Sequence, residues 1–142
     1  MTAEERNALI GHRFVGGTYR IAHWESWLLT DCTGSDPLPD DLVHPIALFH
    51  APILGSGTSI TELFALVGAR GAGSVGLLGY DWEYLQPLRE EIDYRCEGHV
   101  ADVQRATGTD GRLQDTITFR FELFDQLDRP VAIVTNRWLL RR

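Results

Sequence analysis

Residues 79–105 read GYDWEYLQPLREEIDYRCEGHVADVQR, and this stretch decides the fold. Apolar or aromatic side chains alternate with polar ones on both sides of a Pro-Leu-Arg corner at residues 87–89. The alternating positions are Tyr80, Trp82 and Tyr84 before the corner and Ile92, Tyr94 and Cys96 after it. A period of two is typical of antiparallel strands that are buried on one face. The stretch therefore predicts two strands that meet at this corner.

The same alternation continues on both sides of this stretch and predicts a larger sheet. The expected strands cover residues 76–85, 91–105, 113–125 and 130–140, and an earlier strand with a bend covers residues 13–21. Asp110 and Gly111 fit a tight turn between the second and third strands of the C-terminal group. The second half of the chain is thus predicted to be an antiparallel sheet of four strands.

Helices are expected ahead of this sheet. Thr2 and Glu5 have the spacing of a capping box, which predicts a short helix over residues 2–10, and a second helix is expected over residues 23–31. The segment 42–69 is the only one long and apolar enough for a buried helix. Thr58 or Ser59 can cap this helix, but the sequence leaves open whether it begins near residue 46, with bends, or only at residue 57. A helix that is apolar on most faces must be covered by other elements, here by a curled sheet.

Length and composition exclude several classes of function. The 142 residues suit one domain, and no apolar run approaches the roughly 20 residues of a membrane span, so a soluble protein without membrane contact is expected. The formal net charge is −7, which argues against nucleic acid as a partner. The N-terminus lacks the pattern of a signal peptide, which favours the cytoplasm. Cys32 and Cys96 have no ligand spacing around them, so free thiols are expected and no metal site is predicted.

The order of elements and several short motifs resemble the MaoC-like acyl dehydratases and (R)-specific enoyl-CoA hydratases, in particular their N-terminal dehydratase-type domain. The motifs are TGSDP at 33–37, HPIALF at 44–49, QPLR at 86–89, FELFD at 121–125 and VAIVTN at 131–136. The resemblance covers nearly the whole chain. It implies an α+β fold, in which residues 1–142 form a single hot-dog domain with a curled antiparallel sheet wrapped around one central apolar helix.

The resemblance also implies a function. Proteins of this family hydrate enoyl thioesters, or dehydrate 3-hydroxyacyl thioesters, that are linked to coenzyme A or to an acyl carrier protein. The thioester is the substrate, and no further cofactor is implied. Two sheets of this kind are expected to join edge to edge, so the expected partner is a second hot-dog subunit, in a homodimer or a heterodimer.

The catalytic pair of this family is where the chain departs from the pattern. Active hydratases carry an Asp and a His five positions apart, whereas here no acidic residue stands five positions before any histidine. His44 is the candidate general acid or base, with Asp36 or Asp41 to orient it. The structural alternatives are a turn-forming role for Asp36 and a purely structural role for His44.

The candidate substrate-binding residues lie around the predicted helix and at the Pro-Leu-Arg corner. Gly55, Ser56 and Gly57 precede a helix and could offer NH groups to a thioester carbonyl, and Arg89 could hold a phosphate. His50 lies in an apolar run, where a core or interface role is the alternative.

Two further functions compete with the hydratase. The missing spacing favours a non-catalytic subunit that completes the acyl-binding tunnel of a catalytic partner. A hot-dog thioesterase or polyketide-tailoring enzyme would instead use Glu62, the acid within the predicted helix.

Overall fold

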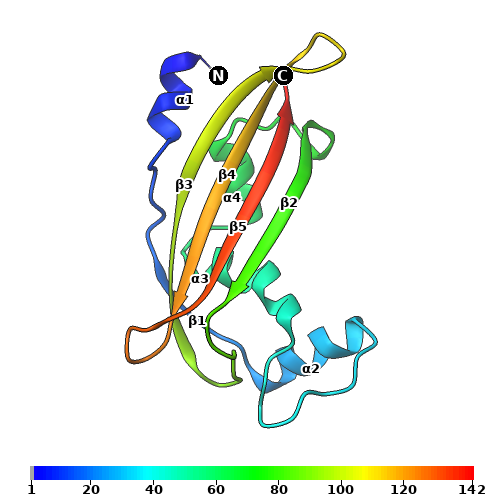
Figure 1. Cartoon of the computed structure of the whole chain (residues 1–142), viewed down its shortest axis with the longest axis vertical. Coiled ribbons are helices and arrows are strands. Elements are labelled where there is room, and N and C mark those ends of the chain that lie inside the picture. The colour runs from blue at the N-terminus through cyan, green and yellow to red at the C-terminus, as the bar shows by residue number, and fades with distance from the viewer. Residues whose placement is uncertain (1) are drawn as a thin grey trace.

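The computed structural model describes residues 2–142 as one antiparallel sheet with helical segments beside it (Figure 1). The strands are β1 (Gly17–Arg20), β2 (Val75–Tyr84), β3 (Asp93–Thr107), β4 (Leu113–Phe124) and β5 (Pro130–Arg141). The helices are α1 (Ala3–Leu9), α2 (His23–Cys32), α3 (Ala51–Gly55) and α4 (Ile60–Leu66), with short 3₁₀ helices η1 (Pro45–Phe49) and η2 (Ala72–Ser74). Within the described residues the strand order is β1-β3-β4-β5-β2, with every neighbouring pair antiparallel.

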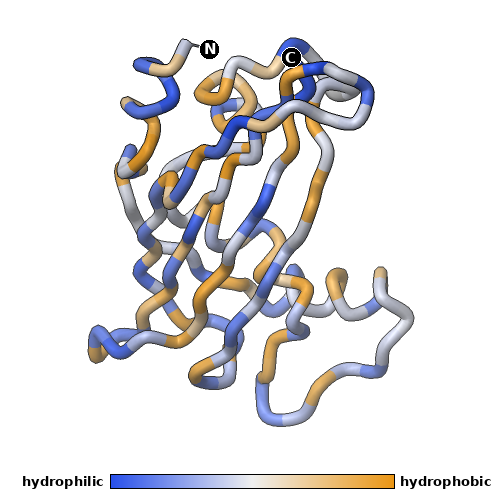
Figure 2. Tube along the Cα trace, turned by 45° about the horizontal axis from the view of Figure 1, so that its top comes forward, coloured by the Kyte–Doolittle hydropathy of each residue, from blue (hydrophilic) through white to orange (hydrophobic). Residues whose placement is uncertain are grey.

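The four C-terminal strands confirm the prediction from the alternating pattern. Along β4, every second residue from Asp115 to Leu123 is buried, and Phe119 and Phe121 are fully buried. The alternation is visible as changing colours along the strands in Figure 2. Apolar residues that share one face of the curled sheet therefore build the core against the helices.

The first strand is shorter than expected. Only Gly17–Arg20 pairs continuously with β3, whereas Arg13 forms an isolated bridge with His99. Gly16 lies between them with φ of +79°, a conformation that glycine adopts at little cost, and it interrupts the regular pairing with β3.

The two N-terminal helices lie where the sequence places them. The Thr2 side chain and the Glu5 carboxylate form the predicted capping box of α1. In α2 the apolar face is largely uncovered, because the side chains of Trp24 and Trp27 are 65% and 54% exposed. Within the described residues, this face of α2 is therefore mostly exposed to solvent.

Of the two alternatives that the sequence left open for the central helix, the structure shows the one that begins near residue 46 and bends. Residues 45–66 form η1, α3 and α4 in succession, and α4 buries only Leu63 among its own residues, whereas α3 is buried at four of its five positions. Pro45 and Pro52 stand at the starts of η1 and α3, because proline has no NH to donate within a helix. Gly57, with φ of +72°, separates α3 from α4, which the Ser59 side chain caps. The segment that the sheet encloses most closely is therefore α3.

The contact between α3 and the sheet depends on a glycine. A Cβ atom added at Gly55 would lie 2.4 Å from the Cys96 sulfur and 3.0 Å from the Tyr19 Cβ. These two residues belong to β3 and β1, so the sheet packs directly against the backbone at the end of α3. This packing fixes the position of His50, which directly precedes α3.

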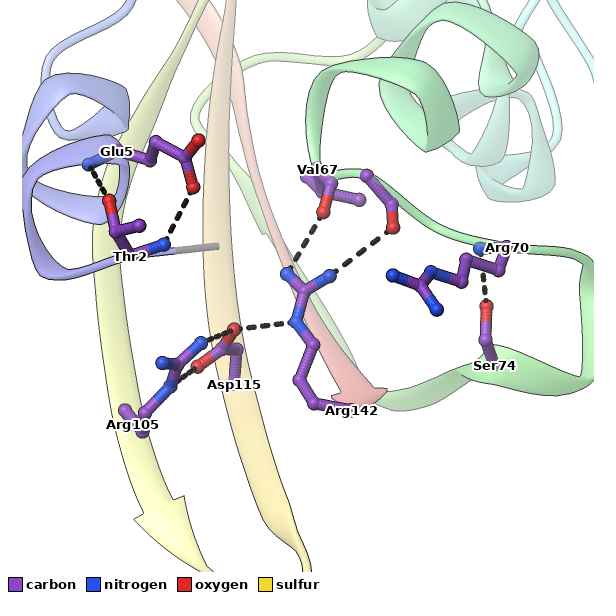
Figure 3. A network of polar contacts seen from close by, with 9 residues as sticks. Thr2, Glu5, Val67, Arg70, Ser74, Arg105, Asp115 and Arg142 are labelled. Carbon is purple, nitrogen blue, oxygen red and sulfur yellow. Dashed lines mark hydrogen bonds and ion pairs between the residues drawn. The ribbon is translucent and has the colours of Figure 1, made fainter.

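A buried carboxylate joins the sheet to the end of α4 (Figure 3). Asp115 is fully buried and accepts hydrogen bonds from Arg105 at 2.6 and 2.8 Å and from Arg142 at 2.7 Å. Arg142 also donates to the carbonyl oxygens of Val67 and Gly68, at the C-terminal end of α4. Burial alone raises the pKa of Asp115, but the two guanidinium groups outweigh burial and lower this pKa below its usual value.

We expect Asp115→Asn to lower the free energy of unfolding at pH 7 by about 1–3 kcal/mol, because two guanidinium groups then lose their carboxylate. A lowered pKa in the folded state stabilises the protein above the unfolded pKa of about 3.9, and this stabilisation is lost as the pH falls further. Urea unfolding at pH 7 and pH 3 measures this, and the difference between wild type and variant should shrink at pH 3. An equal difference at both pH values would contradict the assignment.

Candidate active site

The structure brings His44 to the start of η1, where it acts as a helix cap. Its Nδ1 accepts a hydrogen bond from the NH of Ile46 at 3.2 Å, and its ring is half-buried. With Nδ1 as an acceptor, a neutral ring carries its proton on Nε2. Within residues 2–142, no hydrogen bond or ion pair joins His44 to Asp36 or Asp41. The expected His44–carboxylate pair is therefore not assembled in this chain.

The two carboxylates proposed for that pair lie in different surroundings. Asp36 is exposed in the loop after α2. Asp41 is also exposed, with φ of +57°, and its carbonyl accepts from the NH of Glu90 at 2.9 Å. The Asp41 charge acts on His23, whose pKa is raised chiefly by its hydrogen bond to Glu90. The loop is thus held against the residues after Pro87.

Arg89 belongs to the same junction. It forms an isolated bridge with Leu42, its guanidinium donates to the carbonyl oxygen of Asp40, and its NH donates to the Tyr94 hydroxyl at 2.8 Å. Arg89 remains exposed. Its contacts hold the 40–43 loop in place, while part of its side chain still faces solvent.

The Gly55-Ser56-Gly57 turn closes α3 and does not open α4. The NH of Ser56 donates to the Pro52 carbonyl and the NH of Gly57 donates to the Leu54 carbonyl, both at 3.0 Å. The NH groups expected to be available at a helix start are therefore used by the chain itself. The Ser56 hydroxyl is buried and has no hydrogen-bond partner in the part of the chain that the structure describes.

His50 is the predicted site residue with the most developed polar environment. Its Nε2 lies 2.6 Å from Oε1 of Glu25, and the Tyr19 hydroxyl donates to the same oxygen at 2.8 Å. The side chains of His50 and Glu25 are 30% and 14% exposed, respectively. The Tyr19 ring lies edge-on to the His50 ring, with centroids 5.9 Å apart. Three elements, β1, α2 and the start of α3, thus bring together an imidazole, a carboxylate and a phenol.

The phenol of this cluster stays protonated at physiological pH. Burial, followed by the hydrogen bond and the charge of Glu25, raises the pKa of Tyr19 to about 12. Tyr19 is therefore a permanent donor that holds the Glu25 carboxylate in place. A fixed carboxylate against one ring nitrogen leaves the other nitrogen of a neutral imidazole as a base.

Sequence reasoning missed Glu25 and Tyr19. The partners of His50 stand 25 and 31 positions before it, so no local spacing connects them. A weak signal was present, because Glu25 is an acidic residue within the helix predicted over residues 23–31. Only the packing of α2 beside α3 and β1 joins the three residues.

No known family model matches the chain, and no curated protein matches its sequence. Solved structures do match its fold. The ChsH1–ChsH2 complex of Mycobacterium tuberculosis aligns at 13% identity over 97% of this chain and 87% of that chain, with a TM-score of 0.68. The HadBC (3R)-hydroxyacyl-ACP dehydratase complex of the same organism aligns at 10% identity over 92% and 96%, with a TM-score of 0.67. A monoamine oxidase regulatory protein of Archaeoglobus aligns at 14% identity over 94% and 90%, with a TM-score of 0.66.

The chain has the hot-dog fold, which confirms the fold class predicted from its strands and motifs. At these identities the likeness concerns the fold. The chemistry has to be argued from the residues of this chain.

No helix within residues 2–142 has the length and apolarity that crossing a membrane requires.

Proposed function

We propose that the protein is a cytoplasmic hydratase or dehydratase that acts on acyl thioesters of coenzyme A or an acyl carrier protein, with His50 and Glu25 as its acid–base pair. The observation that supports this most directly is the 2.6 Å contact between His50 and a mostly buried Glu25, beside the helix that the sheet encloses. A positioned imidazole–carboxylate pair of this kind suits proton transfer near neutral pH.

In the hydration direction, Nε2 of His50 donates to Glu25 and Nδ1 takes a proton from water. The resulting hydroxide adds to the β carbon of the enoyl thioester, and the proton now held on Nδ1 passes to the α carbon. Dehydration is the reverse of these steps. Tyr19 does not exchange its proton and keeps the Glu25 carboxylate oriented.

The experiment is hydration of crotonyl-CoA by the purified chain, followed by the loss of the conjugated thioester and by chromatography of the 3-hydroxyacyl product. We expect turnover by the chain alone that depends on His50. Formation of free coenzyme A in place of the hydroxyacyl product would instead indicate a thioesterase. The catalytic role expected for Glu62 in a thioesterase would then still have to be explained, because the Glu62 carboxylate accepts a hydrogen bond from the Ser59 hydroxyl at the exposed start of α4.

A non-catalytic subunit is the second candidate, and the position of His44 favours it. The loop that would carry the family's Asp and His is exposed throughout residues 33–41, and within residues 2–142 no hydrogen bond or ion pair joins one of its carboxylates to His44. In this case the chain completes the acyl-binding tunnel for a hot-dog partner that carries the intact pair. The chain alone is then inactive, and activity appears only with that partner.

Either function is expected to involve a dimer, because the sheet formed by residues 2–142 has a long unpaired edge. Among these residues β2 ends the strand order and pairs only with β5, and its Leu77 and Leu78 are 56% and 52% exposed. We expect light scattering to show a dimer at micromolar concentration and the double variant Leu77→Glu, Leu78→Glu to shift it towards monomer. Like charges would then oppose each other across the shared edge.

Leu127→Glu is the matched control for this dimer prediction. Leu127 is 73% exposed in the turn between β4 and β5, so the same change should leave the oligomeric state unaltered. A wild-type protein that is monomeric at these concentrations would contradict the prediction. Dissociation of the dimer in the Leu127→Glu variant would contradict the assignment of the interface to the β2 edge.

A further inference from the structure

A hollow lies away from the His50 cluster and is lined by residues of α1, of the end of α4 and the loop after it, and of the end of β5. Figure 1 shows α1 and the end of β5 at the same end of the molecule. Its volume is about 770 Å³, within the range of small-molecule sites. One wall comes from α1, with Ala8 and Leu9, and the opposite wall comes from the end of α4, with Leu66 and the loop that follows it. The hollow therefore has apolar walls on two sides.

Positive charge dominates the polar lining. The lining includes Arg70, Arg141 and Arg142 but only one acidic residue, Glu5. Arg142 is engaged by Asp115 and by the end of α4, and Arg105 shares the same Asp115 carboxylate. In a chain with a net charge of −7, this local excess of guanidinium groups is unusual.

Arg70 takes no part in these contacts. Its backbone NH donates to the Ser74 hydroxyl at 3.1 Å, but within residues 2–142 its guanidinium has no hydrogen bond or ion pair. Figure 3 shows this guanidinium pointing towards Arg142, so that two like charges face each other. A guanidinium group without a partner that faces a second guanidinium is stabilised when an anion binds to it.

We propose that this hollow binds a free phosphate monoester that carries an apolar group, with Arg70 as the main contact to the phosphate. A phosphate monoester has a charge of about −1.5 to −2 at pH 7 and three acceptor oxygens, and it suits several guanidinium groups better than a carboxylate does. The apolar group lies between Leu9 and Leu66. The proposal is independent of the function proposed for His50.

The test is isothermal titration calorimetry of the full chain with octyl phosphate, octanoate, octanol and inorganic phosphate. Octyl phosphate should bind most tightly, because the other probes lack either the double charge or the apolar group. Arg70→Gln should weaken this binding by at least about tenfold, the loss expected for one charge-assisted contact. Arg112→Gln is the control, because Arg112 is exposed in the turn between β3 and β4 and lies outside the lining.

A second variant tests the hollow itself. Ala8→Trp places a large side chain on the exposed face of α1 that lines the hollow and should abolish binding without lowering the thermal midpoint. Octanoate binding as tightly as octyl phosphate, or undiminished binding by Arg70→Gln, would overturn the assignment. Arg70-dependent association with phosphatidic acid vesicles would overturn the choice of a free ligand over a lipid surface.

Discussion

Replacing His50 by Ala is expected to lower kcat/KM for hydration of crotonyl-CoA by about 10²- to 10⁴-fold, the usual contribution of a positioned acid or base. Glu25→Gln should also lower kcat/KM, because a neutral amide 2.6 Å from the imidazole cannot stabilise its protonated form as the carboxylate does. Tyr19→Phe should reduce activity less, because Glu25 loses an orienting hydrogen bond but keeps its charge.

His44→Ala is the informative companion to these variants. His44 was the candidate catalytic histidine in the sequence, although the family's spacing is absent, and within residues 2–142 it caps η1 without a carboxylate partner. We expect this variant to keep most of its activity and to lose only the cap, about 1 kcal/mol of stability. If His44→Ala abolished turnover while His50→Ala left it unchanged in a folded protein, the assignment would be reversed and His44 would be the base.

The largest effect on stability is expected from Phe119→Ala, at about 3–5 kcal/mol in the free energy of unfolding. Phe119 is fully buried at the centre of β4, and its ring lies 4.9 Å from that of Trp138 and 6.4 Å from that of Phe14. Chemical denaturation monitored by circular dichroism measures this loss.

Phe49→Ala is the matched control for this measurement. Phe49 is 47% exposed and stacks on Tyr80 at 5.0 Å, so the same truncation removes less buried area. A loss at Phe119 no greater than that at Phe49 would mean that the concave face of the sheet is not the main core.

The central helix shows how far local patterns reach. Prolines and glycines in residues 45–57 indicated possible bends, but the sequence could not show that α3, and not α4, is the segment that the sheet encloses. The choice depends on Gly55, which lets Cys96 and Tyr19 approach the backbone. That contact joins residues 36 or more positions apart, and no pattern within a single segment encodes it.

The sequence by itself determined the sheet. Alternation of apolar and polar residues follows from the geometry of the strand, so strands β2 to β5 and the capping box of α1 could be read directly from residue order. Tertiary structure alone decided the candidate site. Glu25, His50 and Tyr19 meet because α2, α3 and β1 pack together, and the motif-based pair of His44 with Asp36 or Asp41 stays apart because the 40–43 loop is held against Leu88 and Arg89. Polar sites are built from few residues of distant segments, whereas strands repeat their signal at every second residue.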